Sequence, residues 1–251
     1  MGKPKISIIT ICYNSEKTIA HTLQSVAEQN YENLEYIIVD GASKDNTLKV
    51  TEPFKNKISR LISEPDQGIY DAMNKGLNLV TGDIIGILNS DDFYVDNNVI
   101  SKIAKRFDDP AVDCVHADLY YVNKDNTAQI VRHWKSCAYS PGAFIKGWHP
   151  AHPTFFVRKR VYEKYGLFDL NFNLAADFEL MLRFLERYKI NSIHLPEPVV
   201  RMRLGGATSK NIKNIIKQNI ECYKAFKVNG IKVSYLYAFL RILPKLKQFF
   251  S

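Results

Sequence analysis

Long apolar segments are missing from this sequence, in which no run approaches the ~20 residues that a membrane-spanning helix needs. The N-terminus runs straight into a strand-like segment and lacks the architecture of a signal peptide, so we expect a cytoplasmic protein. Cysteine is scarce and lacks the spacing of metal ligands, which favours small buried side chains in a reducing compartment. The four cysteines are Cys12, Cys114, Cys137 and Cys222. Internal repeats and low-complexity segments are also missing.

The composition is typical of a globular protein. The 251 residues suit one large α/β domain or one domain with an appendage, and 46% of them are apolar, enough for a sizeable core. The formal net charge of +8 and the pI of about 9.1 predict anionic partners. Nucleic acid, phosphorylated substrates and anionic lipid are all partners of this kind.

The first half of the chain alternates between strand-like and helix-like segments. Short β-branched and apolar runs predict buried strands at 6–11, 36–39 and 84–88 and a further strand at 61–63. Helical spacing of apolar residues after Asn14, a capping cluster at 45–47 and the segment 69–79 predict the helices. This alternation is typical of a doubly wound, parallel sheet.

Polar and acidic residues follow the predicted strands, at 10–14, 40–45, 64–66 and 89–92. In a doubly wound sheet, ligands bind in the crevice beyond the carboxyl ends of the strands. We therefore expect these segments to meet at one edge of the sheet and to form the functional site there.

The second half of the chain is less regular. We expect a hairpin over 120–131, a short strand at 154–157, a helix after Ala175, and strands at 190–195 and 199–204. From residue 210 onward nine lysines and arginines face a single acid, Glu221, with aromatic and aliphatic residues between them. We interpret residues 209–251 as an amphipathic, basic helical tail outside the core.

Two acidic segments have both a functional and a structural interpretation. Asp91 and Asp92 can bind a hard divalent cation, which can neutralise a pyrophosphate leaving group, and an Asp-rich turn explains them equally well. Asp40 can accept hydrogen bonds from a uracil or a ribose, although a strand-to-helix turn is the favoured interpretation. Asp45 is interpreted as the cap of the helix that follows it.

Three other features leave their alternatives open. Asp177 is favoured as the N-cap of its helix, but a carboxylate within reach of an acceptor hydroxyl can also act as a general base. His149 and His152 have a spacing that suits a metal, while the prolines around them favour a rigid loop. Arg201 and Arg203 fit either a phosphate-binding strand or a solvated edge strand.

Five segments taken in order resemble the family 2 glycosyltransferases of GT-A fold, over about residues 5–208. They are Ser7–Asn14, Ile38–Thr47, Ser63–Gly76, Leu88–Asp92, and Gly166–Asp169 followed by Ala175–Asp177. Such an ordered set is far more specific than any one of its segments. The segment Ser63–Gly76 is most similar to the bacterial branch that builds O-antigen, capsule and colanic acid.

The resemblance implies an α/β fold of GT-A type, with a doubly wound, mostly parallel sheet flanked by helices and a basic helical appendage at the C-terminus. The glycosyltransferase domain would span 1–208, with a nucleotide-binding half (1–118) and an acceptor half (119–208), before the tail (209–251). Asp177 would be the general base and Asp91 the principal ligand of Mn²⁺ or Mg²⁺. The donor would be bound by Thr10, Tyr13, Asn14, Asp40, Asp66, Asp71, Asn89, Ser90, Asp92 and His152.

Within that set the resemblance places Asp40 on the uracil, Asp92 beside the donor sugar and His152 at the metal or the diphosphate. Three positions depart from the pattern of the family. Asn89 stands where the family has the first acid of Asp-x-Asp, Ala176 stands where it has a Glu before the base, and Met73 stands where many members have Arg.

These features predict an inverting, metal-dependent transfer of a hexose or N-acetylhexosamine from a UDP-sugar to an acceptor hydroxyl, because one base and no carboxylate nucleophile are visible. The expected acceptor is a saccharide or a lipid-linked saccharide in the synthesis of a cell-surface polysaccharide. The tail then lies peripherally on the anionic inner face of the cell membrane, or it packs on the domain with solvated lysines.

Two other functions stay open. One is a nucleotidyltransferase that makes the nucleotide-sugar, although residues 10–15 lack the Gly-rich phosphate loop that such enzymes need. The other is a non-catalytic protein that binds or scaffolds sugar nucleotides. Nucleic acid is not expected as a partner, because the strand-end edge is acidic and repels phosphate backbones.

Overall fold

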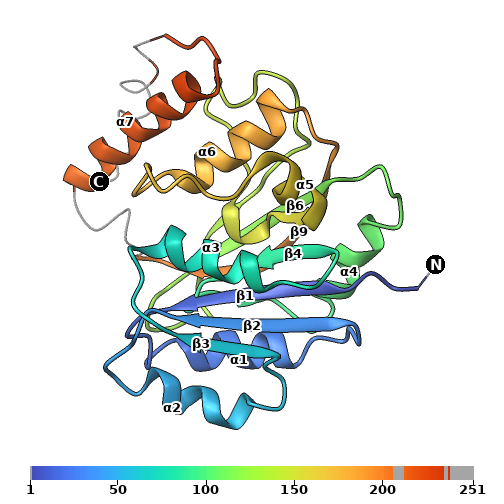
Figure 1. Cartoon of the computed structure of the whole chain (residues 1–251), viewed down its shortest axis with the longest axis vertical. Helices are drawn as coiled ribbons and strands as arrows, with labels where there is room; N and C mark the ends of the chain where they lie inside the picture. The colour runs from blue at the N-terminus through green and yellow to red at the C-terminus, as the bar shows by residue number, and fades with distance from the viewer. Residues whose placement is uncertain (1, 206–211, 235–236, 238–251) are drawn as a thin grey trace.

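The computed structural model describes residues 2–205, 212–234 and 237, and within them nine strands form one sheet (Figure 1). Its parallel half has the order β3-β2-β1-β4. These strands are β1 (Ile6–Cys12), β2 (Leu34–Asp40), β3 (Arg60–Ser63) and β4 (Ile84–Ile87). Every residue of β1 and β4 is buried, as expected for strands covered on both faces. The four strands predicted here from the sequence are confirmed, and they are parallel, although β3 is mostly exposed.

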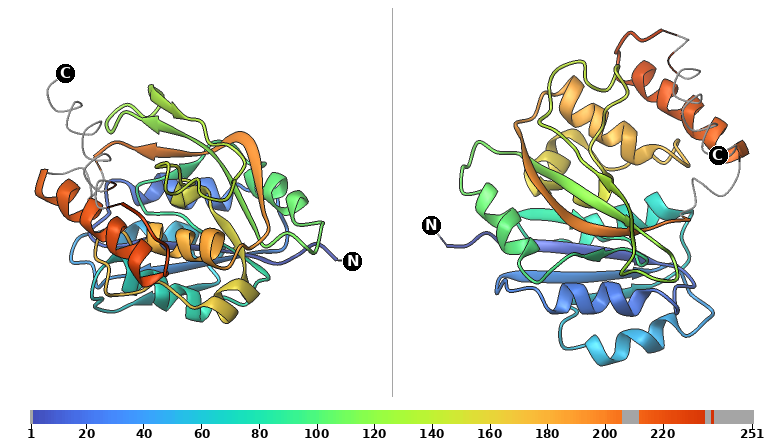
Figure 2. Two further views of the ribbon diagram at one scale, coloured as in Figure 1. Left: turned by 90° about the horizontal axis from the view of Figure 1, so that it is seen from above. Right: turned by 180° about the vertical axis from the view of Figure 1, so that it is seen from behind.

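The other half of the sheet is mixed. β8 (Phe156–Arg158) pairs antiparallel with both β4 and β6 (Cys114–Val122), and so joins the two halves. β6 pairs in turn with β7 (Ile130–Trp134), which confirms the predicted hairpin, and with β9 (Ser192–Arg203) (Figure 2). A short strand, β5 (Phe93–Tyr94), completes the order beside β9.

The prediction of two separate strands at 190–195 and 199–204 is wrong, because β9 runs through both. The register of β9 against β6 shifts beside Pro198, which pairs with Asp118. A proline lacks the backbone N–H that a sheet ladder needs, so the strand continues past it only through an irregularity. The two prolines, Pro196 and Pro198, therefore mark a bulge and not a turn.

Alternate residues of the parallel strands pack into two cores on opposite faces of the sheet. Ile6 and Ile8 of β1 face α1 (Ile19–Ala27) and α4 (Val99–Arg106). The neighbours Ile9 and Ile11 face the other core. Helices of that second core are α3 (Ile69–Leu79), α5 (Lys159–Tyr165) and α6 (Ala176–Leu182), which continues into the π-turn η3 (Arg183–Arg187). Short helical turns are α2 (Thr47–Thr51) and η1 (Glu52–Phe54), which follow β2, and η2 (His152–Thr154), which is packed against β4, β6 and β9.

Gly76 sets how closely α3 approaches the sheet. A Cβ at this position would overlap with the side chain of Ile9 and press on Val39. A glycine is therefore needed where the helix crosses β1 and β2. Because α3 is seated so closely, its N-terminal end is fixed beside the carboxyl ends of these two strands (Figure 1).

The C-terminal segment contains the predicted helix, α7 (Ile212–Val228), but this helix is not outside the core. Cys222, Ala225 and Phe226 are buried in the same core as α6, since α7 has an apolar stripe that packs along that helix. Among the described residues, no helix is long and apolar enough to cross a bilayer. The basic residues 210 and 241–247 of the proposed tail lie outside the described residues.

Three of the four cysteines are buried, as expected, and the expectation is wrong for Cys137, which is exposed in the loop after β7. Cys137 itself belongs to neither core, although Phe144 and Ala151 of the same loop do. The pattern of neighbouring residues did not distinguish it from the other three.

Glu35 of β2 ties together the N-terminal ends of three strands. Its side chain accepts hydrogen bonds from the Ser7 hydroxyl (2.5 Å) and from the backbone and hydroxyl of Thr81 (2.8 and 2.6 Å), and it pairs with Lys5 at 3.3 Å. Burial alone would raise the pKa of Glu35, but these hydrogen bonds outweigh it and lower the pKa from 4.5 to about 2.

We predict that Glu35→Gln lowers the free energy of unfolding by about 1–3 kcal/mol at pH 7, because the amide group cannot accept all of these hydrogen bonds. A carboxylate with a depressed pKa stabilises the fold above its ordinary pKa of 4.5, and this stabilisation is lost as the pH falls toward about 2. Urea unfolding should therefore show a smaller difference in the free energy of unfolding between the variant and the unaltered protein at pH 3 than at pH 7. The exposed Glu32→Gln is the control, and a difference that is independent of pH would contradict the assignment.

Candidate active site

The parallel strands bring the predicted polar segments to one edge of the sheet. Cys12 lies opposite Asp40 in the register of β1 and β2, and Asp40 lies opposite Ser63 in that of β2 and β3. The loops that leave these strands therefore start side by side. On the left of Figure 1 the same edge carries the start of α3 and the loop that leads into α6.

Asp40 and Thr10 form the interior of this edge. The Asp40 carboxylate accepts hydrogen bonds from the backbone and hydroxyl of Ser43 (3.0 and 2.5 Å) and from the Ser63 hydroxyl (2.6 Å). The hydroxyl of Thr10 accepts a hydrogen bond from Tyr36 at 3.1 Å. Both residues are fully buried, so the turn geometry favoured for Asp40 is present, while contact of either residue with a donor stays a prediction.

Tyr13, Asn14 and Asp66 form the exposed surface of the edge. The ring of Tyr13 is 60% exposed, and a Cβ at Gly41 would touch it and overlap with the Asp66 carboxylate. Tyr13 and Asp66 therefore flank the same point of the backbone. Asn14 adopts a left-handed conformation (φ 49°) and accepts a hydrogen bond from the backbone N–H of Lys44 at 2.9 Å. An exposed ring beside a carboxylate can stack on a nucleoside base and accept a hydrogen bond from it.

The other acids of the first half have local partners. Asp71 accepts a hydrogen bond from the backbone of Gln67 at 3.0 Å and pairs with Lys75 at 3.5 Å, so it braces the loop that carries Asp66. Asp45 accepts hydrogen bonds from the backbone and hydroxyl of Thr47 at the start of α2, although the N-cap residue of this helix is its neighbour Asn46. Donor binding by Asp71 stays a prediction.

The segment that follows β4 contains the candidate metal ligands. Ser90 shares a hydrogen bond with Ser15 at 2.8 Å, and Asn89 donates to the Asp92 carboxylate at 3.5 Å. Asp92 is fully enclosed, and its other oxygen accepts the backbone N–H of Arg203 at 3.3 Å. Asp92 therefore holds the turn together, while Asp91 is only partly buried.

Arg203 of β9 counters the negative charge of these two acids. Burial raises the pKa of Asp91, and it raises the pKa of Asp92 well above its usual range; the Arg203 guanidinium opposes both shifts. The guanidinium donates to the backbone carbonyl of Asp91 and lies 2.6 Å from Nδ1 of His21. Arg203 is almost fully buried, so a solvated edge strand is the wrong interpretation for this residue.

The residues at the end of β4 fit a hard divalent cation that is coordinated partly by the protein and partly by a substrate. The Oδ1 atom of Asn89 is buried and lacks a hydrogen-bond partner within the described part of the chain. In that part, no group of three or more His, Cys, Asp or Glu side chains is arranged to hold a metal. A cation such as Mg²⁺ is commonly held by one or two carboxylates together with phosphate oxygens and water, and Asp91 with Asn89 satisfies that pattern.

Asp177 is the second residue of α6, and it is not the N-cap of this helix. The N-cap position is Ala175, which makes no side-chain cap. The carboxylate of Asp177 instead accepts a hydrogen bond from the hydroxyl of Tyr70 on α3, at 3.0 Å. The capping interpretation that the sequence favoured is therefore wrong, because Asp177 lies two residues after the N-cap and its carboxylate contacts a partner on another helix.

Aromatic rings surround this hydrogen bond. Tyr70 stacks on Phe168, with ring centroids 5.6 Å apart, and His152 meets the edge of Phe168 at 5.7 Å. Burial lowers the pKa of His152, and the negative charge of Asp177 partly restores it. Burial raises the pKa of Tyr70 well above 10, and Asp177 adds to this shift, so the hydroxyl stays protonated and donates. His149 packs edge-on against Phe178 and Trp134.

Sequence reasoning missed Tyr70 as a site residue. It lies within the segment Ser63–Gly76 and at an apolar position of α3, so its spacing predicts only a core residue. The available signal was chemical, because a buried tyrosine needs a partner for its hydroxyl. Sequence reasoning named Arg203 but missed its pairing with Asp91 and Asp92, because these acids lie more than 100 residues away along the chain.

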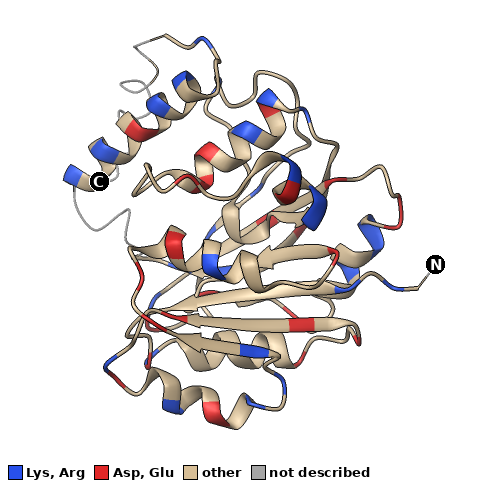
Figure 3. Cartoon of the chain, viewed as in Figure 1, with Lys and Arg blue, Asp and Glu red and all other residues tan. Residues whose placement is uncertain are grey.

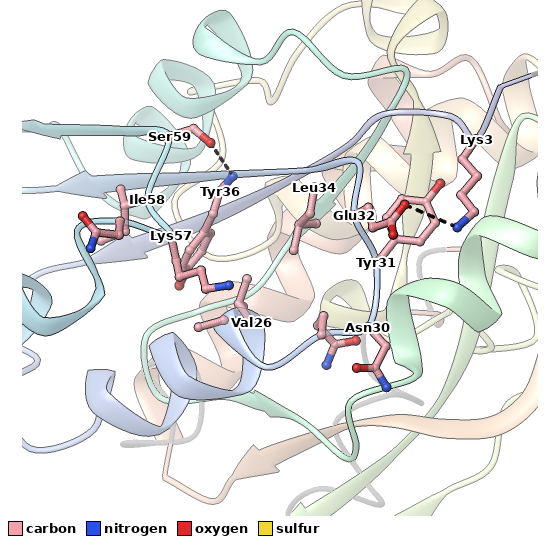
Figure 4. Close-up of a pocket in the computed structure, with 13 residues that line it drawn as sticks. Lys3, Val26, Asn30, Tyr31, Glu32, Leu34, Tyr36, Lys57, Ile58 and Ser59 are labelled. Carbon is pink, nitrogen blue, oxygen red and sulfur yellow. Dashed lines mark hydrogen bonds and ion pairs between the residues drawn. The ribbon is translucent and has the colours of Figure 1, made fainter.

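A cavity of about 670 Å³ lies at the opposite edge of the sheet (Figure 4). Its lining includes Lys3, Tyr31 and Leu34, at the N-terminal ends of β1 and β2. Ligands of doubly wound sheets bind at the carboxyl ends of the strands, so this cavity is not the candidate site.

Comparisons with known proteins agree with this architecture. A glycosyltransferase of Mycobacterium tuberculosis that is described as uncharacterized is 29% identical over 182 residues, which cover 72% of this chain and 68% of that protein. The structure is similar to TarS residues 1–349 of S. aureus in complex with UDP (TM-score 0.63, 19% identity, 86% of this chain and 65% of that chain). It is also similar to the mannosyltransferase PcManGT of Pyrobaculum calidifontis in complex with GDP-Man and Mn²⁺ (TM-score 0.66, 19% identity, 91% and 68%).

The two structural likenesses show that the fold is that of GT-A glycosyltransferases, as the sequence predicted. This chain spans less than two thirds of the TarS fragment. The sequence model described as Glycosyl transferase family 2 matches residues 7–167, well over half of the chain. The matched residues include β1 to β4, the turn at Asp91 and the strand β8. The protein therefore belongs to glycosyl transferase family 2.

Proposed function

We propose that the protein transfers a hexose or N-acetylhexosamine from a UDP-sugar to an acceptor hydroxyl, with inversion at the anomeric carbon. The observation that carries the proposal is the Asp177 carboxylate, held by Tyr70 at the edge where Asp91 follows β4. The acceptor is a saccharide or a lipid-linked saccharide used in the synthesis of a cell-surface polysaccharide.

Asp177 acts as the general base of this reaction. The Tyr70 hydroxyl donates to Oδ1 of Asp177, so Oδ2 of Asp177 accepts the proton of the acceptor hydroxyl. The acceptor oxygen forms a bond to the anomeric carbon while the bond from that carbon to the diphosphate oxygen breaks. UDP leaves with the electron pair, and the sugar passes through an oxocarbenium-like state. A single displacement of this kind inverts the configuration.

The donor lies along the edge between Tyr13 and Asp91. The exposed ring of Tyr13 stacks on the uracil, and Asp66 accepts a hydrogen bond from it. When bound at Asp91 and Asn89, Mn²⁺ or Mg²⁺ would supply positive charge to the diphosphate leaving group. The UDP complex of TarS supports a UDP donor, and the Mn²⁺ in PcManGT supports a divalent cation.

Asp177→Asn should lower kcat for transfer by about 100-fold or more, because the amide cannot accept the proton, and should leave the affinity for UDP within about twofold. UDP-glucose, UDP-galactose and their N-acetyl forms are screened first for transfer by the unaltered protein, and NMR of the product should show the inverted anomer. The exposed Asp108→Asn is the matched control. Turnover near the unaltered rate would remove Asp177 from this role.

EDTA should abolish transfer, and added Mn²⁺ should restore it. Asp91→Asn should raise the Mn²⁺ concentration for half-maximal rate about tenfold or more, because one carboxylate ligand is lost. Calorimetry with UDP present measures the same loss as weaker Mn²⁺ binding. An unchanged rate in EDTA would contradict a metal at Asp91.

We also propose that α7 lies on an anionic membrane surface, where it would bring the edge to a lipid-linked acceptor. Basic residues recur along α7 (Figure 3), and its exposed face combines them with aliphatic residues. This face consists of Lys213, Ile216, Lys217, Ile220, Lys224, Lys227 and Val228. Ile220 is 58% exposed, which is unusual for a residue whose neighbours pack into a core.

Replacing Lys213, Lys217 and Lys227 with Gln should weaken co-sedimentation with phosphatidylglycerol vesicles at least tenfold, because each basic residue near such a surface contributes ~1 kcal/mol. The exposed lysines Lys49, Lys55 and Lys57, on the far side of the sheet, give a control with the same change in charge. Equal loss in both variants would show that net charge alone matters, and no loss in either would contradict the membrane surface.

A further inference from the structure

Glu221 is a buried acid on a helix that otherwise carries only basic charges. Glu221 is the only Asp or Glu between residues 212 and 228, and it is just 7% exposed. A buried carboxylate is costly unless its oxygens are satisfied. The Oε2 atom of Glu221 accepts two hydrogen bonds, from the backbone N–H groups of Leu174 at 2.8 Å and Ala175 at 3.0 Å.

These two N–H groups belong to the turn that leads into α6, directly before Asp177. Ala175 is the N-cap of this helix and makes no side-chain cap, and Ala176 is fully buried and apolar. The turn therefore lacks a polar side chain of its own at these positions. The carboxylate that satisfies it comes from α7, 46 residues away from Ala175 along the chain.

Other contacts align α7 with α6. The side chain of Asn229, just beyond α7, donates to the Glu179 carboxylate at 2.9 Å, and Phe226 meets Phe178 edge-on at 5.8 Å. The charge of Glu221 also raises the pKa of Tyr70, after burial and the larger effect of Asp177, so the acid lies within electrostatic reach of the Tyr70–Asp177 pair.

We propose that Glu221 is a positioning residue for Asp177, holding the backbone of Leu174 and Ala175 so that the Asp177 carboxylate meets both Tyr70 and the acceptor. The role in the reaction rests on the proposed function, in which Asp177 is the base. The C-terminal helix is then part of the catalytic architecture, through a single carboxylate that reaches across from α7.

Three variants at position 221 test this role. Glu221→Ala removes both hydrogen bonds and should lower kcat about tenfold or more, with the affinity for UDP within about twofold, because the donor side of the edge is untouched. Glu221→Gln keeps an oxygen that can accept both N–H groups and should restore most of the rate. Glu221→Asp keeps the charge but shortens the reach of the side chain, so its kcat should be lower than that of Glu221→Gln. This variant replaces Glu221→Ala if Glu221→Ala does not fold.

Asn229→Ala is the matched control, because it removes the other side-chain hydrogen bond from this segment to α6 and leaves the turn before Asp177 intact. Its kcat should stay within about threefold of the unaltered protein. In the double variant with Asp177→Asn, Glu221→Ala should cause no further loss, since it acts through Asp177. The proposal would be overturned if Glu221→Ala lowered kcat only as much as Asn229→Ala does. It would also be overturned if Glu221→Ala lowered kcat further in the Asp177→Asn background.

Hydrogen exchange measured by mass spectrometry tests the positioning without any substrate. In Glu221→Ala, peptides that cover residues 172–178 should exchange faster, while peptides of β1 and β4 stay unchanged and Asn229→Ala leaves residues 172–178 protected. Unchanged exchange in this segment would overturn the proposal even if the protein is active. Conversely, if no nucleotide-sugar supports transfer by the unaltered protein, the proposed function fails while the exchange result still decides whether Glu221 fixes the segment that carries Asp177.

Discussion

The hydrogen bond from Tyr70 to Asp177 joins the two halves of the site. Tyr70 lies on α3, which follows β3 of the parallel half of the sheet, and Asp177 lies on α6, which comes between β8 and β9 of the mixed half. Burial keeps the tyrosine protonated, so the bond has one direction, from hydroxyl to carboxylate. Because Gly76 lets α3 sit close against β1 and β2, this bond fixes the position of Asp177 relative to the carboxyl ends of these strands.

The parallel half of the sheet supplies the rest of the geometry. Its register places the ends of β1, β2 and β3 beside one another, and the turn after β4 presents Asp91 next to them. Two acids at this edge, Asp40 and Asp92, stabilise neighbouring turns, because their oxygens accept hydrogen bonds from these turns and from β9. Asp66, Asp91 and Asp177 are only partly buried, and these are the carboxylates that the proposed function assigns to a ligand.

Local sequence patterns predicted the elements well, because buried parallel strands such as Ile6–Cys12 are continuous apolar runs followed by polar turns. Long-range relations were not predictable in this way. Nothing near Asp177 indicates that its partner is Tyr70, 107 residues earlier, and nothing near Glu221 indicates that it satisfies Leu174 and Ala175. The apolar stripe of α7 likewise reveals that the helix needs a partner layer, but its sequence does not say that α6 provides it.

The proposed function requires that Asp91 and Asp177 face each other across a single bound sugar. A crystal structure with UDP-sugar and Mn²⁺ bound tests it most directly. The account predicts that the Mn²⁺ contacts an Asp91 oxygen and the diphosphate, and that the Asp177 carboxylate lies on the opposite side of the anomeric carbon from the leaving oxygen. A donor bound with Asp177 directed away from that carbon, or a diphosphate remote from Asp91, would contradict the account.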